Sequence, residues 1–259
     1  MNLRAGGLTL ALLSGLAASA AAYAPLGYPG STWGNLSRDL DGLEGNGTMG
    51  NIRQGVDWAK LPGGVTFNTF GAYRWRFRSE QRPYYNAAGP GVGFDFSRGP
   101  LAAGLDLSWV RYPELSRDTR DFLLYGSWYR RWDISRWTGK PYWGLRSALA
   151  VPFSTWGRVE YDIDGVEGAG SQGWVKQGID WVKVQGVILN TFASYNWRLR
   201  SDNQKFYNAH GPAVGVQFDR GPLNLVLDYN WRSYPQLQEY TRTFGLTLTW
   251  YYGWDFKRR

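Results

Sequence analysis

The chain has 259 residues and no cysteine, which excludes disulfide bonds and thiol chemistry. Aromatic residues make up 17% of it, with 15 Trp and 17 Tyr, yet its mean hydropathy is only −0.43. Such a composition suits strands in which only alternate residues are apolar, and no apolar run after residue 24 is long enough for a transmembrane helix. The net charge of +8 comes from basic residues interleaved with acidic ones, so we expect no nucleic-acid partner.

The N-terminus has the pattern of a secretory signal peptide. Arg4 precedes an apolar stretch from Leu8 to Leu16, and small residues follow up to Ala24. We therefore expect residues 1–24 to be removed on export and residues 25–259 to form one domain. A mature N-terminal helix is the alternative interpretation of this stretch.

The chain contains a long internal repeat. Residues 31–34 (Ser-Thr-Trp-Gly) recur at 154–157, the motif Gly55–Trp58 recurs as Gly178–Trp181, and Gly89–Pro113 recurs as Gly211–Pro235. Similarity of this extent predicts a duplication. The first unit covers residues 31–134, a connector covers 135–153, and the second unit covers 154–256.

Each unit is predicted to contain six strands. From Leu223 onward, Leu223, Leu225 and Leu227 alternate with polar positions such as Asn224 and Asp228, and a period of two is the mark of a strand. The same pattern predicts strands in the second unit at about 156–164, 173–183, 187–200, 212–219, 223–233 and 242–256. Strands of this length can cross a bilayer when tilted.

The predicted connections alternate in length. Residues 61–64 and 97–100 indicate tight turns, whereas 42–50, 79–89 and 112–120 indicate longer polar loops. Short turns on one side, longer loops on the other and an even number of strands are typical of bacterial outer-membrane barrels. Trp residues also occur near both ends of the apolar faces, as the aromatic girdles of such barrels require: Trp197 and Trp231 toward the loops, Trp181 and Trp254 toward the turns.

On these features, and on the closing Trp254-Asp255-Phe256, the chain resembles the Gram-negative outer-membrane β-barrel proteins as a class, over nearly all of its length after residue 24. Those proteins usually end on the aromatic residue, whereas this chain continues with residues 257–259 (Lys-Arg-Arg). The resemblance implies an all-β fold, an antiparallel transmembrane β-barrel of about twelve strands built from two tandem six-strand repeats, with both termini in the periplasm. It also implies contact with outer-membrane lipid, lipopolysaccharide and the barrel-assembly machinery. A secreted soluble β-protein with inward apolar faces is the alternative.

If the apolar faces look outward, the polar residues line the lumen. One interpretation is structural, in which inward Arg and Asp side chains pair across the barrel. The other is a water-filled pore whose Arg residues favour anionic solutes. The sequence Arg-x-Arg occurs at positions 76/78 and 198/200, and we place both pairs near the loop-side mouth. Asp41 and Asp164 could bind them there. The candidates for lining the pore are Arg74, Arg76, Arg78, Asp57, Asp106, Asp180, Asn196, Arg198, Arg200, Asn224, Asp228, Asn230 and Arg232.

Two glycine-rich segments spell G-x-G-x-x-G, at residues 45–50 and 168–173. A phosphate-binding loop needs a parallel strand before this motif and a helix after it, and neither is predicted here. We interpret both segments as external hairpin loops in which glycine supplies turn conformations.

His210 is the single histidine, and its counterpart in the first unit is Ala88. A barrel enzyme acting on lipid would need a serine beside it, and no spacing singles one out. One histidine and no cysteine make a transition-metal site improbable, and we expect no cofactor. The acidic pairs Asp39/Asp41 and Asp162/Asp164 fit either a Ca²⁺ site or solvent-exposed strand ends.

The sequence leaves three functions open. The first is a non-enzymatic, porin-like channel that passes small polar or anionic solutes through a lumen lined by Arg and Asp. The second is a closed barrel that acts as a structural scaffold or a surface receptor through its long loops. The third is a lipid-acting barrel enzyme with His210 as its base.

Overall fold

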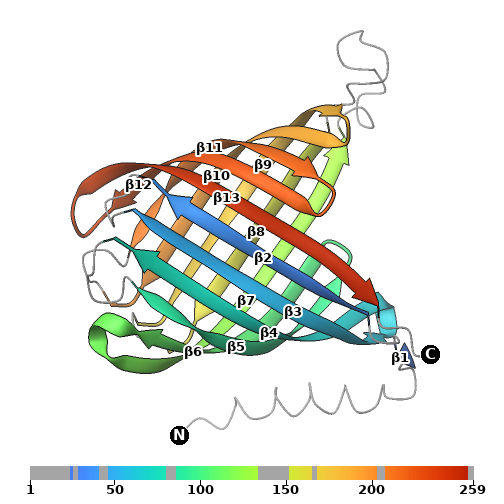
Figure 1. Cartoon of the computed structure of the whole chain (residues 1–259), viewed down its shortest axis with the longest axis horizontal. Helices are drawn as coiled ribbons and strands as arrows, with labels where there is room; N and C mark the ends of the chain where they lie inside the picture. The colour runs from blue at the N-terminus through green and yellow to red at the C-terminus, as the bar shows by residue number, and fades with distance from the viewer. Residues whose placement is uncertain are drawn as a thin grey trace, which may run out of the picture.

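A computed structural model describes residues 24–25, 29–40, 46–79, 86–133, 152–164, 168–202 and 208–255. The expected signal peptide, apart from Ala24, and nearly all of the connector 135–153 lie outside the described residues. In the described part, twelve strands form one antiparallel barrel (Figure 1): β2 (Pro29–Asp39), β3 (Gly47–Leu61), β4 (Val65–Arg78), β5 (Ala87–Arg98), β6 (Leu101–Tyr112), β7 (Arg117–Asp133), β8 (Pro152–Asp162), β9 (Gly170–Val184), β10 (Val187–Arg200), β11 (Ala209–Arg220), β12 (Leu223–Tyr234) and β13 (Glu239–Asp255).

The barrel is closed by its first and last long strands. Each strand pairs with its neighbour in sequence, and β13 pairs with β2 from Gly245↔Asp39 to Asp255↔Pro29. The short β1 (Ala24–Pro25) adds to the end of β3. Closure leaves no unpaired edge between the twelve strands, which confirms the fold class predicted from the sequence. No helix in the described ranges is long and apolar enough to cross a membrane.

The two ends of the barrel differ, although less than the sequence predicts. At the turn end, the 3₁₀ turn η2 (Pro62–Gly64) and the pairs 99–100, 185–186 and 221–222 connect neighbouring strands. The prediction of a long loop over 112–120 is wrong, because only η3 (Pro113–Leu115) and Ser116 separate β6 from β7. The segments 42–50 and 79–89 are also shorter loops than predicted, since β3 begins at Gly47 and β5 at Ala87. Backbone pairing continues through these polar residues because a polar side chain does not interrupt a ladder.

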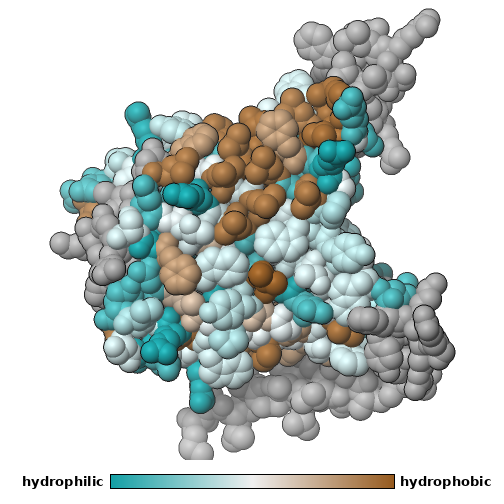
Figure 2. All heavy atoms as spheres, in the orientation of Figure 1, coloured by the Kyte–Doolittle hydropathy of each residue, from teal (hydrophilic) through white to brown (hydrophobic). Residues whose placement is uncertain are grey.

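The outer wall is apolar and the inner wall polar. Outward positions carry exposed large side chains such as Phe77, Val92, Leu124 and Val214. Figure 2 shows the most apolar residues gathered over the upper part of the wall facing the viewer and hydrophilic residues toward both of its ends. The buried set on the other face is rich in Asp, Asn and Arg. An apolar surface of this extent on a closed barrel suits contact with lipid rather than water.

Tryptophan and glycine face each other across the outer wall. Trp75 lies opposite Gly50, and a Cβ added at Gly50 would lie 2.4 Å from Trp75 Cζ2. The same relation recurs in four more cross-strand pairs: Gly34 with Trp250, Gly157 with Trp128, Gly173 with Trp197, and Gly30 with Trp254. Each indole covers backbone that a glycine leaves bare, a known way to stabilise glycine in strands.

Local geometry of the first unit occurs again in the second. The ladder between β3 and β4 shifts register at Asp57/Ala59, and the ladder between β9 and β10 shifts at Leu189/Asn190. At these bulges Trp58 Nε1 donates to Thr69 Oγ1 (2.6 Å) and Trp181 Nε1 donates to Thr191 Oγ1 (2.7 Å). Corresponding inward positions of β2–β7 and β8–β13 can therefore be compared directly.

Candidate functional site

A cavity of about 960 Å³ lies inside the barrel. From β3 to β6, its lining residues come only from the loop-end half of each strand, whereas along β11–β13 the lining continues into the turn-end half. Of the predicted candidates, those that line it are Arg74, Arg76, Asn196, Arg198, Arg200, Asn224, Asp228 and Arg232. The other candidates (Asp57, Arg78, Asp106, Asp180 and Asn230) face inward but are held in contacts with other side chains.

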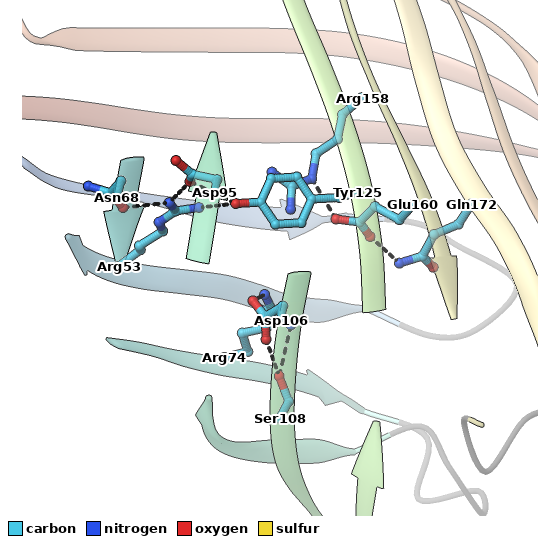
Figure 3. Close-up of polar contacts among 10 residues, drawn as sticks. All are labelled: Arg53, Asn68, Arg74, Asp95, Asp106, Ser108, Tyr125, Arg158, Glu160 and Gln172. Carbon is cyan, nitrogen blue, oxygen red and sulfur yellow. Dashed lines mark hydrogen bonds and ion pairs between the residues drawn. The ribbon is translucent and has the colours of Figure 1, made fainter. Parts of the chain in front are cut away.

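The turn-end half of the first unit is filled by a polar network around Arg53 (Figure 3). The Arg53 guanidinium from β3 pairs with Asp95 of β5, and it donates to Tyr125 Oη (2.9 Å) and Asn68 Oδ1 (3.3 Å). The Tyr125 hydroxyl donates to Asp95 Oδ2 (2.8 Å). The guanidinium also lies 3.4 Å from the centroid of the Phe70 ring. We call Arg53, Asn68, Asp95 and Tyr125 the Arg53 network; none of the four lines the cavity.

The network continues along the inner wall through the Tyr125 ring, from β7 to the neighbouring strand β8. Arg158 of β8 lies 4.4 Å from the centroid of this ring, and its Nε donates to Glu160 Oε1 (2.5 Å). Gln172 of β9 donates to Glu160 (2.6 Å) and accepts from Arg200 (3.3 Å). Side chains from β3 to β10 are thus linked inside the barrel, which restrains its cross-section.

A second ion pair lies beside the Arg53 network. Arg74 of β4 pairs with Asp106 of β6 and donates to Ser108 Oγ (3.0 Å), while Ser108 Oγ donates to Asp106 Oδ1 (2.8 Å) (Figure 3). Asp106 is fully buried, whereas the Arg74 side chain is one-third exposed to the cavity. The lumen-facing charges of the first unit are therefore mostly neutralised within the wall.

At the loop end, each unit has one buried Arg–Asp pair. Arg78 pairs with Asp39 (2.5 Å) and Arg200 with Asp162 (3.0 Å), and all four side chains are less than 10% exposed. Of the two partners suggested by the sequence, Asp164 accepts a hydrogen bond from the backbone N–H of Phe122 (3.0 Å), and Asp41 lies outside the described residues.

The register explains this choice of partners. Gly47 lies between Asp39 and Arg78 in the ladder, and a Cβ there would meet the Arg78 side chain at 2.4 Å. Gly170 lies in the same way between Asp162 and Arg200. The interpretation of both glycine-rich motifs as loops is therefore wrong from Gly47 and Gly170 onward. These are strand glycines that let an Arg side chain cross the neighbouring strand.

The second unit lacks the Arg53 network. Arg53 and Lys176 correspond because each lies two residues before the repeated Gly-x-Asp-Trp motif. In the part of the repeat that follows the motif, Asp95 corresponds to Gln217 and Tyr125 to Thr247. Lys176, Gln217 and Thr247 all line the cavity. Shorter or neutral side chains thus leave open in the second unit the space that the network fills in the first.

Sequence reasoning placed the Arg-x-Arg and Asp positions but missed Arg53, Asp95 and Tyr125. In the sequence, Arg53 stands among neutral residues at the neighbouring inward positions Asn51 and Gly55. The signal that could have found Arg53 is its position in phase with Asp57 on the same strand, β3.

His210 lies on the outer wall. Its Nδ1 is 2.8 Å from the Tyr195 hydroxyl, with which it forms a hydrogen bond, and the two rings stack with centroids 6.2 Å apart. Ser233 is opposite His210 in the β11–β12 ladder, but no hydrogen bond joins their side chains in the described part of the chain. Within that part, no group of His, Asp and Glu could hold a metal ion.

No protein-family model and no curated protein matches the chain. Among solved structures it is similar to the β domain of the Bordetella autotransporter BrkA (13% identity, 88% of this chain and 99% of that chain, TM-score 0.43). It is also similar to LpxR from Salmonella typhimurium (12%, 85% and 99%, TM-score 0.46) and to the outer membrane protein opdK from Pseudomonas aeruginosa (8%, 88% and 99%, TM-score 0.32). Because these TM-scores are below 0.5, the barrel assignment rests on the strand pairing of this chain.

Proposed function

We propose that the chain is an outer-membrane channel for small polar or anionic solutes. The observation that carries the proposal is the cavity, which extends toward the turn end along β11–β13, opposite the filled half of the first unit. A lumen with a polar lining on one side is what passive diffusion of hydrated solutes requires.

The charge of the lining supports a preference for anions. Basic side chains outnumber acidic ones among the lining residues: Arg74, Arg76, Arg158, Lys176, Arg198, Arg200 and Arg232, against Asp121, Glu160, Asp162 and Asp228. Seven basic side chains against four acidic ones give the lining an excess of positive charge. A net positive field in a narrow pore raises the local concentration of anions.

The outer wall supports the location in a membrane. A closed barrel satisfies every backbone group of its wall, and the exposed apolar side chains between its ends match a lipid-facing band. Export through the expected signal peptide would take the chain out of the cytoplasm, as insertion into the outer membrane requires.

The test is single-channel conductance of the purified, refolded chain in a planar bilayer, with reversal potentials measured in a KCl gradient. We expect a steady conductance with anion preference. Replacing two lining residues, Arg198→Gln and Arg232→Gln, reduces that preference, whereas Arg38→Gln does not, because Arg38 is exposed and outside the cavity lining. Protein that is folded and inserted but silent would refute the channel.

The filled half of the first unit favours a second candidate, a closed barrel that works through its loops. The Arg53 network and the Arg74–Asp106 pair occupy the lumen as a plug would. Silence in the bilayer assay, together with normal folding, is the outcome that this candidate predicts.

A further inference from the structure

Two ion pairs of the first unit have only one charged residue each at the corresponding positions of the second. The first unit has Arg53–Asp95 and Arg74–Asp106. In the second unit, the corresponding positions are Lys176 with Gln217 and Asn196 with Asp228. One pair has kept its cation and lost its anion, and the other has kept its anion and lost its cation. A lone positive and a lone negative side chain remain, and both line the cavity.

Lys176 is held in place by aromatic rings. Its Nζ lies 4.0 Å from the centroid of the Phe192 ring and 5.4 Å from the centroids of the Trp156 and Trp174 rings. In the described part of the chain no carboxylate forms an ion pair with it, and Asp228 and Asp219 are the acids near enough to act on its charge. Three ring faces orient the ammonium without neutralising it.

Asp228 is also fixed without an ion pair in the described part of the chain. Its Oδ1 would lie 2.2 Å from a Cβ built on Gly245, so the carboxylate rests against backbone that a glycine leaves open. In the first unit, the residue that corresponds to Gly245 is Leu123. Lys176 and Arg232 are the cations near enough to act on the charge of the carboxylate, and Lys176 forms no ion pair with it among the described residues.

We propose that Lys176 and Asp228 form a binding site for a small zwitterion, a soluble solute that carries both a carboxylate and an ammonium group. Lys176 would bind the carboxylate and Asp228 the ammonium, while Trp156 and Trp174 would pack against the body of the solute. The site deepens the proposed channel function, on which its role in transport rests, by naming a solute class. Unpaired charges in a half-buried site are costly unless a partner completes them, and a zwitterion completes both at once.

The binding test does not depend on conduction. Saturation-transfer NMR of the folded chain in detergent measures the binding of three probes. Glycine carries both a carboxylate and an ammonium group, acetate carries only the carboxylate, and methylammonium carries only the ammonium group. We expect glycine to bind more tightly than either single-charge probe. Lys176→Met keeps the aliphatic contact with the rings, Asp228→Asn keeps the shape, and each weakens glycine binding at least about tenfold, as expected for one charged hydrogen bond.

Two matched variants control for charge alone. Lys183→Met removes a positive charge from the same strand, and Asp118→Asn removes a negative charge from β7; neither residue lines the cavity, and glycine binding should stay unchanged. No glycine binding, or equal binding of glycine and acetate with no effect of Asp228→Asn, would overturn the zwitterion site. Glycine binding by a chain that is silent in the bilayer would remove the channel and keep the site. A chain that conducts but does not bind glycine would refute the zwitterion site and leave the channel in place.

Discussion

Removing the carboxylate of Asp95 tests whether the Arg53 network holds the first unit together. Arg53 and Asp95 side chains are each only 11% exposed, so the substitution Asp95→Asn leaves a buried guanidinium with two neutral acceptors and the Phe70 ring. Breaking one side of a buried ion pair costs about 3–5 kcal/mol, and contact with the ring offsets about 1 kcal/mol of this. We therefore expect a loss of about 3 kcal/mol in the free energy of unfolding.

The assay is urea unfolding of the refolded barrel, followed by Trp fluorescence and extrapolated linearly to water. A double-mutant cycle with Arg53→Met isolates the pair, because the double variant carries no orphaned charge. We expect a coupling energy of about 2–3 kcal/mol. Asp228→Asn is the matched control: it removes a carboxylate that has no ion pair, so it should cost less than about 1 kcal/mol. A coupling energy below about 0.5 kcal/mol, or equal losses for Asp95→Asn and Asp228→Asn, would refute the reasoning.

Three further predictions concern other parts of the wall. Gly50→Ala forces a methyl group against Trp75 and should lower the free energy of unfolding, measured by urea titration, by about 1–3 kcal/mol. In the control Gly71→Ala no atom lies near the added Cβ, so the free energy of unfolding should change by less than about 0.5 kcal/mol. Arg200→Gln breaks the buried pair with Asp162 and should cost about 3 kcal/mol, while changing the reversal potential less than Lys176→Met does; the opposite ranking would contradict the assignment of Arg200 to structure. His210→Ala removes one exposed hydrogen bond to Tyr195 on the outer wall, so conductance should not change and stability should fall by about 1 kcal/mol at most.

The sequence was sufficient for the strands because a period of two is a local signal. It placed Asn224 and Asp228 on one face and Leu223 and Leu225 on the other, as the barrel has them. It could not identify the pairs across the lumen. Arg53 and Tyr125 are 72 positions apart, and their contact depends on how strands β3 to β7 curve around the barrel.

Glycine shows the same limit more sharply. Gly47 and Gly50 belong to a motif that suggests a loop when the sequence is considered alone. In the barrel, both are strand residues: Gly47 lets Arg78 cross to Asp39, and Gly50 lies beneath the indole of Trp75. What fixes a glycine at these positions is a side chain on the neighbouring strand, and such a requirement leaves no trace in the local pattern.

The two units together suggest how a barrel with one repeated scaffold can combine rigidity with an open path. In the first unit, ion pairs that cross the inner wall neutralise the charges and fill the turn-end half of the lumen. In the second, Gln217, Thr247 and Asn196 replace three of the partners, which frees space and leaves Lys176 and Asp228 without the ion pairs that their counterparts form. If the replacements served only stability, we would expect Lys176 and Asp228 to be replaced by neutral residues as well. A neutral or apolar pair is at least as stable as a buried ion pair that has lost one partner. The retention of one charge of each sign, both facing the same cavity, is better explained by a partner that comes from solution.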